Sequence, residues 1–115
     1  MQAVHYPGLG THPGHSIAKA QQHGFGAMLS FEIAGGAEAA RRFCEAVEVF
    51  TLAESLGGVE SLVAHPATMT HASMDPDTRR AVGINDRLLR LSIGLEAEAD
   101  LQDDLSSALS ASTRR

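Results

Sequence analysis

A single arginine set among leucines is the residue of this chain that most clearly suggests ligand chemistry. Arg90 lies in the run RLLRLSIGL, at residues 87–95, where a charge is costly unless it is paired. A guanidinium donates two parallel hydrogen bonds and so matches the geometry of a carboxylate, which makes Arg90 a candidate group for binding an acidic ligand. The pattern alone favours the alternative, an edge residue that reaches water or pairs with Glu32 or Glu96.

A second candidate group stands where an apolar run ends in polar residues. The stretch FTLAESLGG places Glu54 and Ser55 just before Gly57 and Gly58. Because glycines allow a ligand or another backbone to approach closely, Glu54 and Ser55 are candidates for contact with a small polar ligand. The ordinary alternatives are a solvated acid for Glu54 and a turn hydroxyl bonded to its own backbone for Ser55. Thr70, in HPATMTHAS, is by default a loop hydroxyl.

Six histidines raise the question of a metal site. His12 and His15 are close in sequence, and His65 and His71 bracket a loop, but their spacing matches no common zinc set and no cysteine accompanies them. We therefore predict no metal site. Cys44 lies on the apolar stripe of a predicted helix, so we expect it to fill the core and not to act as a nucleophile.

The strands that must position these residues are predicted from alternating apolar and polar side chains. Residues 27–33 and 87–95 alternate clearly, which places Arg90, Ser92 and Gly94 on the face opposite to Leu89 and Leu91. Residues 49–55 and 61–65 are shorter candidates. About four strands in a mainly antiparallel sheet, with helices packed on one face, make an α+β fold.

Four helices are predicted between these strands, at residues 13–23, 37–50, 76–82 and in the region after residue 96. The second carries an apolar stripe and two outer ion pairs, Glu38 with Arg42 and Arg41 with Glu45. Asp75 before Pro76 is a strong start for the third helix. The last helix has its apolar stripe at Leu101, Leu105, Ala108 and Leu109.

Length and composition limit the classes of function. The 115 residues suffice for one domain, which we place at 13–110 between an irregular opening segment, 1–12, and a tail, 111–115, that we expect to fray. The net charge of −5 and the scattered basic residues exclude nucleic acid as a partner. The apolar runs are too short to span a membrane, and MQAVHYPGLG shows no secretory signal. The lone Cys44 favours the cytoplasm.

Five segments together resemble a known family. YPGL, HPGHSIAKAQ, GFGAMLSFEI, FTLAESLGGVESLVAHPATMTHAS and GINDRLLRLSIGLE are similar to the C-terminal region of the Cys/Met-metabolism enzymes that use pyridoxal 5'-phosphate (PLP). Within that family the likeness is to cystathionine gamma-synthase and cystathionine gamma-lyase. It covers the chain from Val4 to about Leu109, and the block at residues 50–73 is its most specific part.

The resemblance implies a role for each candidate residue. The arginine matching Arg90 binds the alpha-carboxylate of the amino-acid substrate. The residues matching Ser55 and Thr70 help to arrange the substrate and the Schiff-base lysine, and the acid matching Glu54 bears on the choice between beta and gamma chemistry. The same likeness implies PLP as cofactor and, as partners, a large PLP-binding domain and identical subunits in a homotetramer.

The chain departs from the family in one decisive respect. Its only lysine is Lys19, in HSIAKAQQ, which matches a helix of the small domain and not the segment that carries the Schiff-base lysine. PLP chemistry needs that lysine, so we expect no catalytic residue in this chain, no bound PLP and no transsulfuration activity by the chain alone. The alternative is a non-catalytic module that serves assembly or interaction. The sequence does not decide between synthase and lyase.

Overall fold

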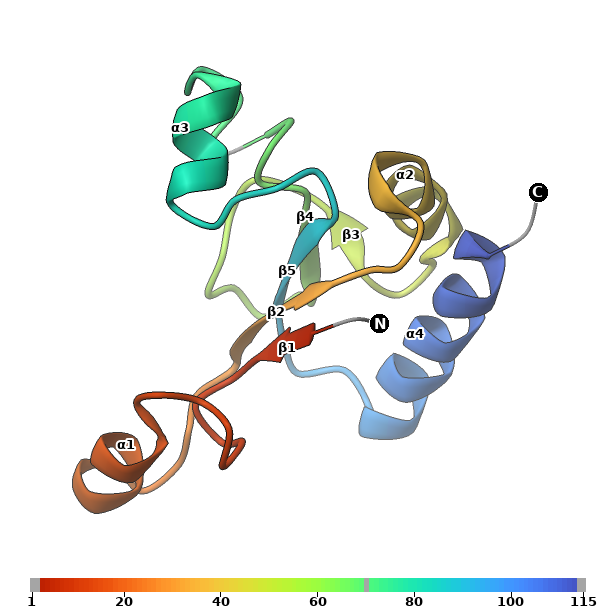
Figure 1. Cartoon of the computed structure of the whole chain (residues 1–115). Coiled ribbons are helices and arrows are strands. Elements are labelled where there is room, and N and C mark those ends of the chain that lie inside the picture. The colour runs from red at the N-terminus through yellow and green to blue at the C-terminus, as the bar shows by residue number, and fades with distance from the viewer. Residues whose placement is uncertain (1–2, 70, 114–115) are drawn as a thin grey trace.

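The computed structural model describes residues 3–69 and 71–113, which form one sheet flanked by helices (Figure 1). The strands are β1 (Ala3–His5), β2 (Met28–Glu32), β3 (Thr51–Leu52), β4 (Leu62–Ala64) and β5 (Leu88–Ser92). The helices are α1 (His15–Gln21), α2 (Gly36–Ala46), α3 (Pro76–Ala81) and α4 (Glu98–Ser112). The predicted α+β class with a mainly antiparallel sheet is confirmed.

The sheet has the strand order β1-β2-β5-β4-β3, so β5 is its central strand. All pairings are antiparallel except that of β3 with β4, which is parallel. Arg90 lies in register between Ser30 of β2 and Ala64 of β4. The alternative of an edge arginine is therefore wrong, because strands are paired on both sides of Arg90.

Alternation along the strands directs one set of side chains into the core. Phe31, Val63, Leu89 and Leu91 are at most 1% exposed and pack with Phe43 of α2. The rings of Phe31 and Phe43 meet edge to face, with centroids 5.4 Å apart. This geometry is favourable beyond the area buried, because the positive edge of one ring meets the negative face of the other.

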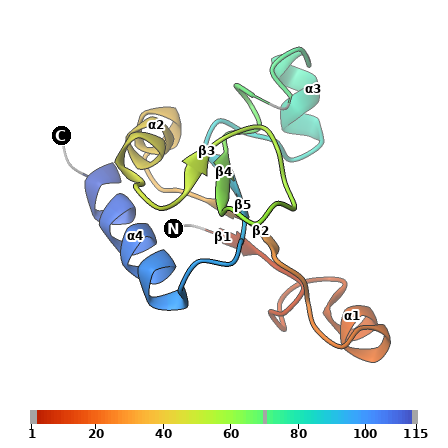
Figure 2. The same ribbon diagram turned by 180° about the vertical axis from the view of Figure 1, so that it is seen from behind.

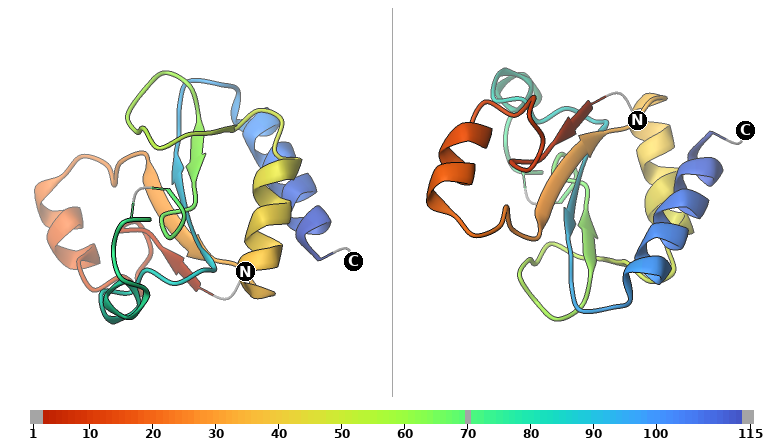
Figure 3. Two further views of the ribbon diagram at one scale, coloured as in Figure 1. Left: turned by 90° about the horizontal axis from the view of Figure 1, so that it is seen from above. Right: turned by 90° about the horizontal axis from the view of Figure 1, so that it is seen from below.

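The four helices do not all cover the same face of the sheet. Helices α2 and α4 pack side by side over the apolar face, whereas α1 and α3 lie on the other side (Figures 2 and 3). Helix α1 belongs to a small projecting lobe in which His15 stacks on Phe25, at a centroid distance of 5.3 Å, and Tyr6 meets Phe25 edge to face. The expectation that helices pack on one face of the sheet therefore holds for α2 and α4.

Helix α2 ends earlier than its sequence pattern predicts. The helix was expected to cover 37–50, but it ends at Ala46 and the next residue is extended. The cause lies in α4, where buried Asp104 accepts hydrogen bonds from the backbone N–H groups of Glu48, Val49 and Phe50 at 2.7, 2.9 and 2.9 Å. Because these three N–H groups bond the Asp104 carboxylate and not helix carbonyls, Asp104 fixes the turn from α2 into β3.

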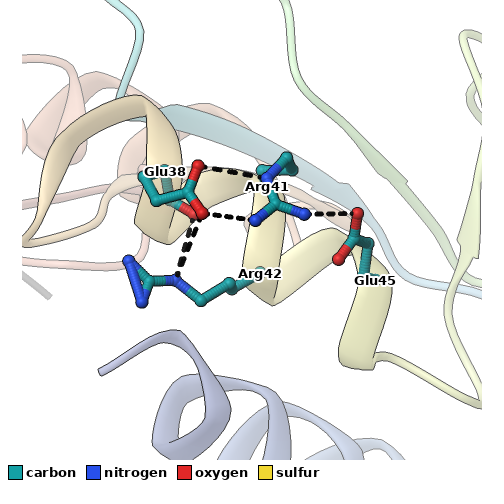
Figure 4. A network of polar contacts seen from close by, with 4 residues as sticks. All are labelled: Glu38, Arg41, Arg42 and Glu45. Carbon is teal, nitrogen blue, oxygen red and sulfur yellow. Dashed lines mark hydrogen bonds and ion pairs between the residues drawn. The ribbon is translucent and has the colours of Figure 1, made fainter. Parts of the chain in front are cut away.

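The outer surface of α2 carries the ion pairs predicted from sequence (Figure 4). Arg41 pairs with Glu45 at 2.7 Å, and Arg42 lies 3.9 Å from Glu38. Arg41 also pairs with Glu38, a contact that the i, i+4 spacing did not include. All these groups are at least partly exposed, so we expect little stabilisation from them.

Both ends of the chain differ from expectation. The opening segment 1–12 was predicted to be irregular, but Ala3–His5 form β1 and pair with Ser30–Glu32. At the other end α4 continues to Ser112, which is 3% exposed and donates its hydroxyl to the carbonyl of Leu109. Helix α4 thus extends into the segment 111–115 that was expected to fray, whose last two residues lie outside the described part.

Candidate functional site

The structure brings Arg90 and Glu54 together through the backbone. Arg90 points away from the apolar core, and its Nη2 donates a hydrogen bond to the carbonyl oxygen of Glu54 at 3.1 Å. Ser55 follows directly and is exposed, as is Glu54 itself. Strand β3 ends at Leu52, so both residues lie on a loop and not within a strand of residues 49–55 as predicted. Loop residues held beside a strand arginine are well placed to meet a ligand from solvent.

The loop of Glu54 and Ser55 is attached to β5 by groups that the sequence did not single out. Gly57 has a φ of +76°, a conformation that glycine adopts readily, and its N–H donates to the hydroxyl of Ser92 at 2.9 Å. Further along, the Glu96 carboxylate accepts from the N–H and the hydroxyl of Ser61 at 2.8 and 2.6 Å. One sequence pattern could have pointed to this attachment: the alternation of side chains that places Ser92 on the same face as Arg90.

The two acids proposed as partners for Arg90 bond elsewhere. Glu32 accepts from Asn85 at 2.6 Å and from Arg87 at 3.3 Å, and His5 lies 3.4 Å away. The hydrogen bond from Asn85 is the main cause that lowers the pKa of Glu32, and Arg87 adds to it. The hydrogen bonds from Ser61 likewise lower the pKa of Glu96. Both carboxylates are therefore held in their charged form by groups other than Arg90.

Thr70 lies outside the described residues, so its predicted role stays a prediction. The chain on either side of it is held by Arg79 of α3. The Nη1 of Arg79 donates to the carbonyl oxygens of Ala67, His71 and Ala72 at 2.8, 3.3 and 3.4 Å. The Arg79 guanidinium thus forms hydrogen bonds with backbone carbonyls before and after residue 70.

A cavity beside α2 lies away from Arg90. It has a volume of about 430 Å³ and is lined by α2 and the turn after β4, including Cys44, Leu52, His65 and Met69. Burial, with Glu45 nearby, raises the pKa of Cys44 to about 11, so its thiol stays protonated at neutral pH. This agrees with the expectation that Cys44 is not a nucleophile.

The residues around Arg90 do not fit a PLP site. A Schiff base needs a lysine amine, and Lys19 is exposed on α1, in the lobe that projects from the sheet. No cluster of three or more potential metal ligands occurs among residues 3–69 and 71–113. Over the same residues, every helix is too short or too polar to cross a bilayer. What the site offers is one oriented guanidinium beside a polar loop, a group suited to a carboxylate.

Comparison with known proteins places these features in a family. The family model for Cys/Met metabolism PLP-dependent enzymes matches residues 1–110. The chain is 51% identical over 114 residues to cystathionine gamma-synthase of Escherichia coli K12, covering 99% of this chain and 30% of that protein. It is 55% identical over 106 residues to cystathionine beta-lyase of Lactococcus lactis subsp. cremoris MG1363, covering 92% of this chain and 28% of that protein.

A solved structure agrees with the sequence relatives. Cystathionine gamma-synthase of Xanthomonas oryzae pv. oryzae, in complex with cystathionine, superposes with a TM-score of 0.91 at 59% sequence identity. The match covers 96% of this chain and 29% of that one. The chain therefore spans about 30% of the length of the relatives it matches.

Proposed function

We propose a function from the premise that this chain belongs to the family of Cys/Met metabolism PLP-dependent enzymes. Within an enzyme of that family it forms the C-terminal domain, residues 13–110, that binds the substrate carboxylate. The enzyme acts on a sulfur amino acid or a homoserine ester by gamma-replacement or gamma-elimination. PLP supplies the chemistry that labilises bonds to the substrate's alpha carbon, and the Schiff-base lysine comes from the rest of the enzyme.

The orientation of Arg90 is the observation that carries this proposal. Its guanidinium stands on the central strand, on the face away from the core, and one of its five N–H groups is used by the Glu54 carbonyl. The bond to Glu54 fixes the plane of the guanidinium, and the other N–H groups can take the two oxygens of a carboxylate. Ser55 and Thr70 complete the polar surroundings of the substrate, and Glu54 influences the reaction type. Arg90 acts by positioning the substrate and not by transferring a proton.

The relatives do not decide between a synthase and a lyase. A gamma-synthase and a beta-lyase match the chain at 51% and 55% identity. The proposal also includes a large PLP-binding domain as the partner of this chain. It further includes assembly into the homotetramer of the family and a cytoplasmic location. By itself the chain is inactive and has no PLP site, because its only lysine, Lys19, lies on α1, in the lobe that projects from the sheet, and not beside Arg90.

A hybrid enzyme tests the domain assignment. The chain replaces the matching C-terminal 30% of the Escherichia coli gamma-synthase, to which it is 51% identical. Arg90→Ala in this hybrid should raise KM for the amino-acid substrate about 30-fold or more, since removing one member of a charge-assisted pair costs about 2–5 kcal/mol. Arg87→Ala is the matched control, because Arg87 bonds Glu32 instead. A folded, PLP-loaded hybrid without turnover, or an unchanged KM in Arg90→Ala, would contradict the proposal.

Exposed apolar side chains favour a second function, that of a non-catalytic assembly module. Val59 is 68% exposed and Leu95 is 82% exposed, and they lie on neighbouring segments joined by a hydrogen bond from Leu95 N–H to the Val59 carbonyl at 2.9 Å. Apolar groups in such a position suit a protein contact. Sedimentation of the purified chain with and without the remainder of the enzyme, together with an assay of activity in the mixture, separates the two functions. An assembly module associates without restoring activity.

A further inference from the structure

Alternate residues of one strand and its continuation all contact the same loop. Arg90 bonds the carbonyl of Glu54, and Ser92 accepts from the N–H of Gly57. The N–H of Gly94 donates to the hydroxyl of Ser61 at 2.8 Å, and Glu96 accepts twice from Ser61. Arg90 and Ser92 share one face of β5, because side chains alternate along a strand. The contacts of Gly94 and Glu96, which follow the strand, continue this row along residues 54–61.

The row is tightly packed at its centre. A Cβ atom on Gly94 would lie 2.2 Å from the carbonyl oxygen of Val59 and 2.6 Å from the carbonyl carbon of Glu60. Only glycine fits there, because backbone atoms cannot give way as a flexible side chain can. Ser61 is fully buried and Ser92 is 2% exposed. Their hydroxyls are therefore shielded from water, and each has its partner within the protein.

The row determines where the Glu54 carbonyl stands relative to Arg90. The loop 54–60 is exposed throughout, and little apolar burial holds it in place. Its position follows from the polar anchors at Gly57 and Ser61 and from the hydrogen bond of Leu95 to Val59. If the anchors are lost, the Glu54 carbonyl moves and the guanidinium loses the bond that orients it.

We propose that Ser92 and the Ser61–Glu96 pair are positioning residues for substrate binding: they fix the loop 54–61 so that the Glu54 carbonyl holds Arg90 in the orientation that receives the substrate carboxylate. The inference rests on the proposed function of Arg90. Neither Ser92 nor Glu96 touches the substrate in this scheme, and both act through Arg90.

The first experiment uses the 115-residue chain itself. Ser92→Ala removes the acceptor for the Gly57 N–H, and Ser92→Thr keeps a hydroxyl. In NMR spectra the Gly57 amide should exchange with solvent about tenfold faster in Ser92→Ala, and the Arg90 Nε–H resonance should shift. Ser92→Thr should restore both signals toward those of the unchanged chain. An Arg90 resonance that stays in place while Gly57 is released would overturn the inference.

The second experiment measures substrate binding in the hybrid enzyme. Loss of one anchoring hydrogen bond should raise KM about 2- to 12-fold in Ser92→Ala and Glu96→Gln, with kcat changed less than twofold. Glu98→Gln is the control, because Glu98 accepts a hydrogen bond from Gln102 within α4 and does not belong to the row. A fall in kcat with KM unchanged would speak against positioning.

A double-mutant cycle separates this inference from the function of Arg90. If Ser92 acts through Arg90, Ser92→Ala should raise KM in the hybrid but have no further effect in an Arg90→Ala background. Effects on KM that simply add would overturn the inference and leave the role of Arg90 intact. An Arg90→Ala hybrid with unchanged KM would instead contradict the proposed function.

Discussion

The two faces of the sheet are stabilised by different interactions. On the face covered by α2 and α4, apolar side chains such as Phe31 and Leu91 exclude water almost completely. On the opposite face, Arg90 and Ser92 meet the loop 54–61 through hydrogen bonds to its backbone. Apolar contacts are non-directional, whereas hydrogen bonds fix distances and angles. The first face therefore supplies stability, and the second supplies the geometry that a ligand site needs.

Neighbouring residues of β5 provide the strongest test of this contrast. Leu91 is 1% exposed on the core face, so Leu91→Ala should lower the free energy of unfolding by about 2–5 kcal/mol. Arg90→Ala, one residue earlier on the other face, should cost about 1 kcal/mol or less, because its hydrogen bond to the Glu54 carbonyl is exposed to solvent. Urea titration of the 115-residue chain measures both changes. Equal losses would show that the two faces contribute alike to stability.

A polar exception on the helix-covered face gives a smaller effect. The Asp104 carboxylate accepts hydrogen bonds from three backbone N–H groups. Asp104→Asn should lower the free energy of unfolding by about 1–3 kcal/mol, because the NH₂ group of asparagine would face N–H donors. Asp103→Asn, next to it on α4 and exposed, is the matched control and should leave the urea midpoint unchanged. If both variants unfold at the same urea concentration, Asp104 does not anchor the turn after α2.

The smallest effect concerns pH and the loop face. Hydrogen bonds from Ser61 hold the pKa of Glu96 below its ordinary value of 4.5, so the carboxylate stabilises the fold at neutral pH. Because the folded pKa is the lower one, this contribution is present above pH 4.5 and is lost as the pH falls below it. The difference in unfolding free energy between the unchanged chain and Glu96→Gln should therefore shrink between pH 7 and pH 3.

Glu98→Gln is the control for the pH experiment, since it removes the same charge nearby without touching Ser61. Urea titrations of all three proteins at each pH give the comparison. A difference between the unchanged chain and Glu96→Gln that stays constant with pH would show that the Glu96 charge does not stabilise the loop.

Sequence patterns predicted the elements that depend on local periodicity. The alternation at 27–33 and 87–95 located β2 and β5, and the cap at Asp75 located α3, where its carboxylate accepts from Asp77 and Thr78. Strand β1 was missed because three residues carry no clear period and exist as a strand only through pairing with β2. Strand β3 was predicted too long, since only its parallel pairing with β4 sets its length.

The candidate site was predictable in its residues but not in its connections. An arginine among leucines identified Arg90, and a resemblance supplied its expected role. The bonds from Ser61 to Glu96 and from Gly57 to Ser92 join residues 35 positions apart, a separation that no periodic pattern reports. Such contacts depend on the tertiary fold, which is why Glu96 was considered as a partner for Arg90 and not for Ser61.

The central position of β5 has a consequence for the synthesis of the protein. β5 pairs with β2 and β4 on its two sides, yet it leaves the ribosome after the other four described strands of the sheet. Until residues 88–92 emerge, one edge of β2 and one edge of β4 remain unpaired, and open strand edges invite pairing with other chains. The pairing of β2 with β5 joins segments far apart in the sequence, and contacts of this kind form slowly. The nascent chain therefore needs protection from aggregation until β5 has paired with both of its neighbours.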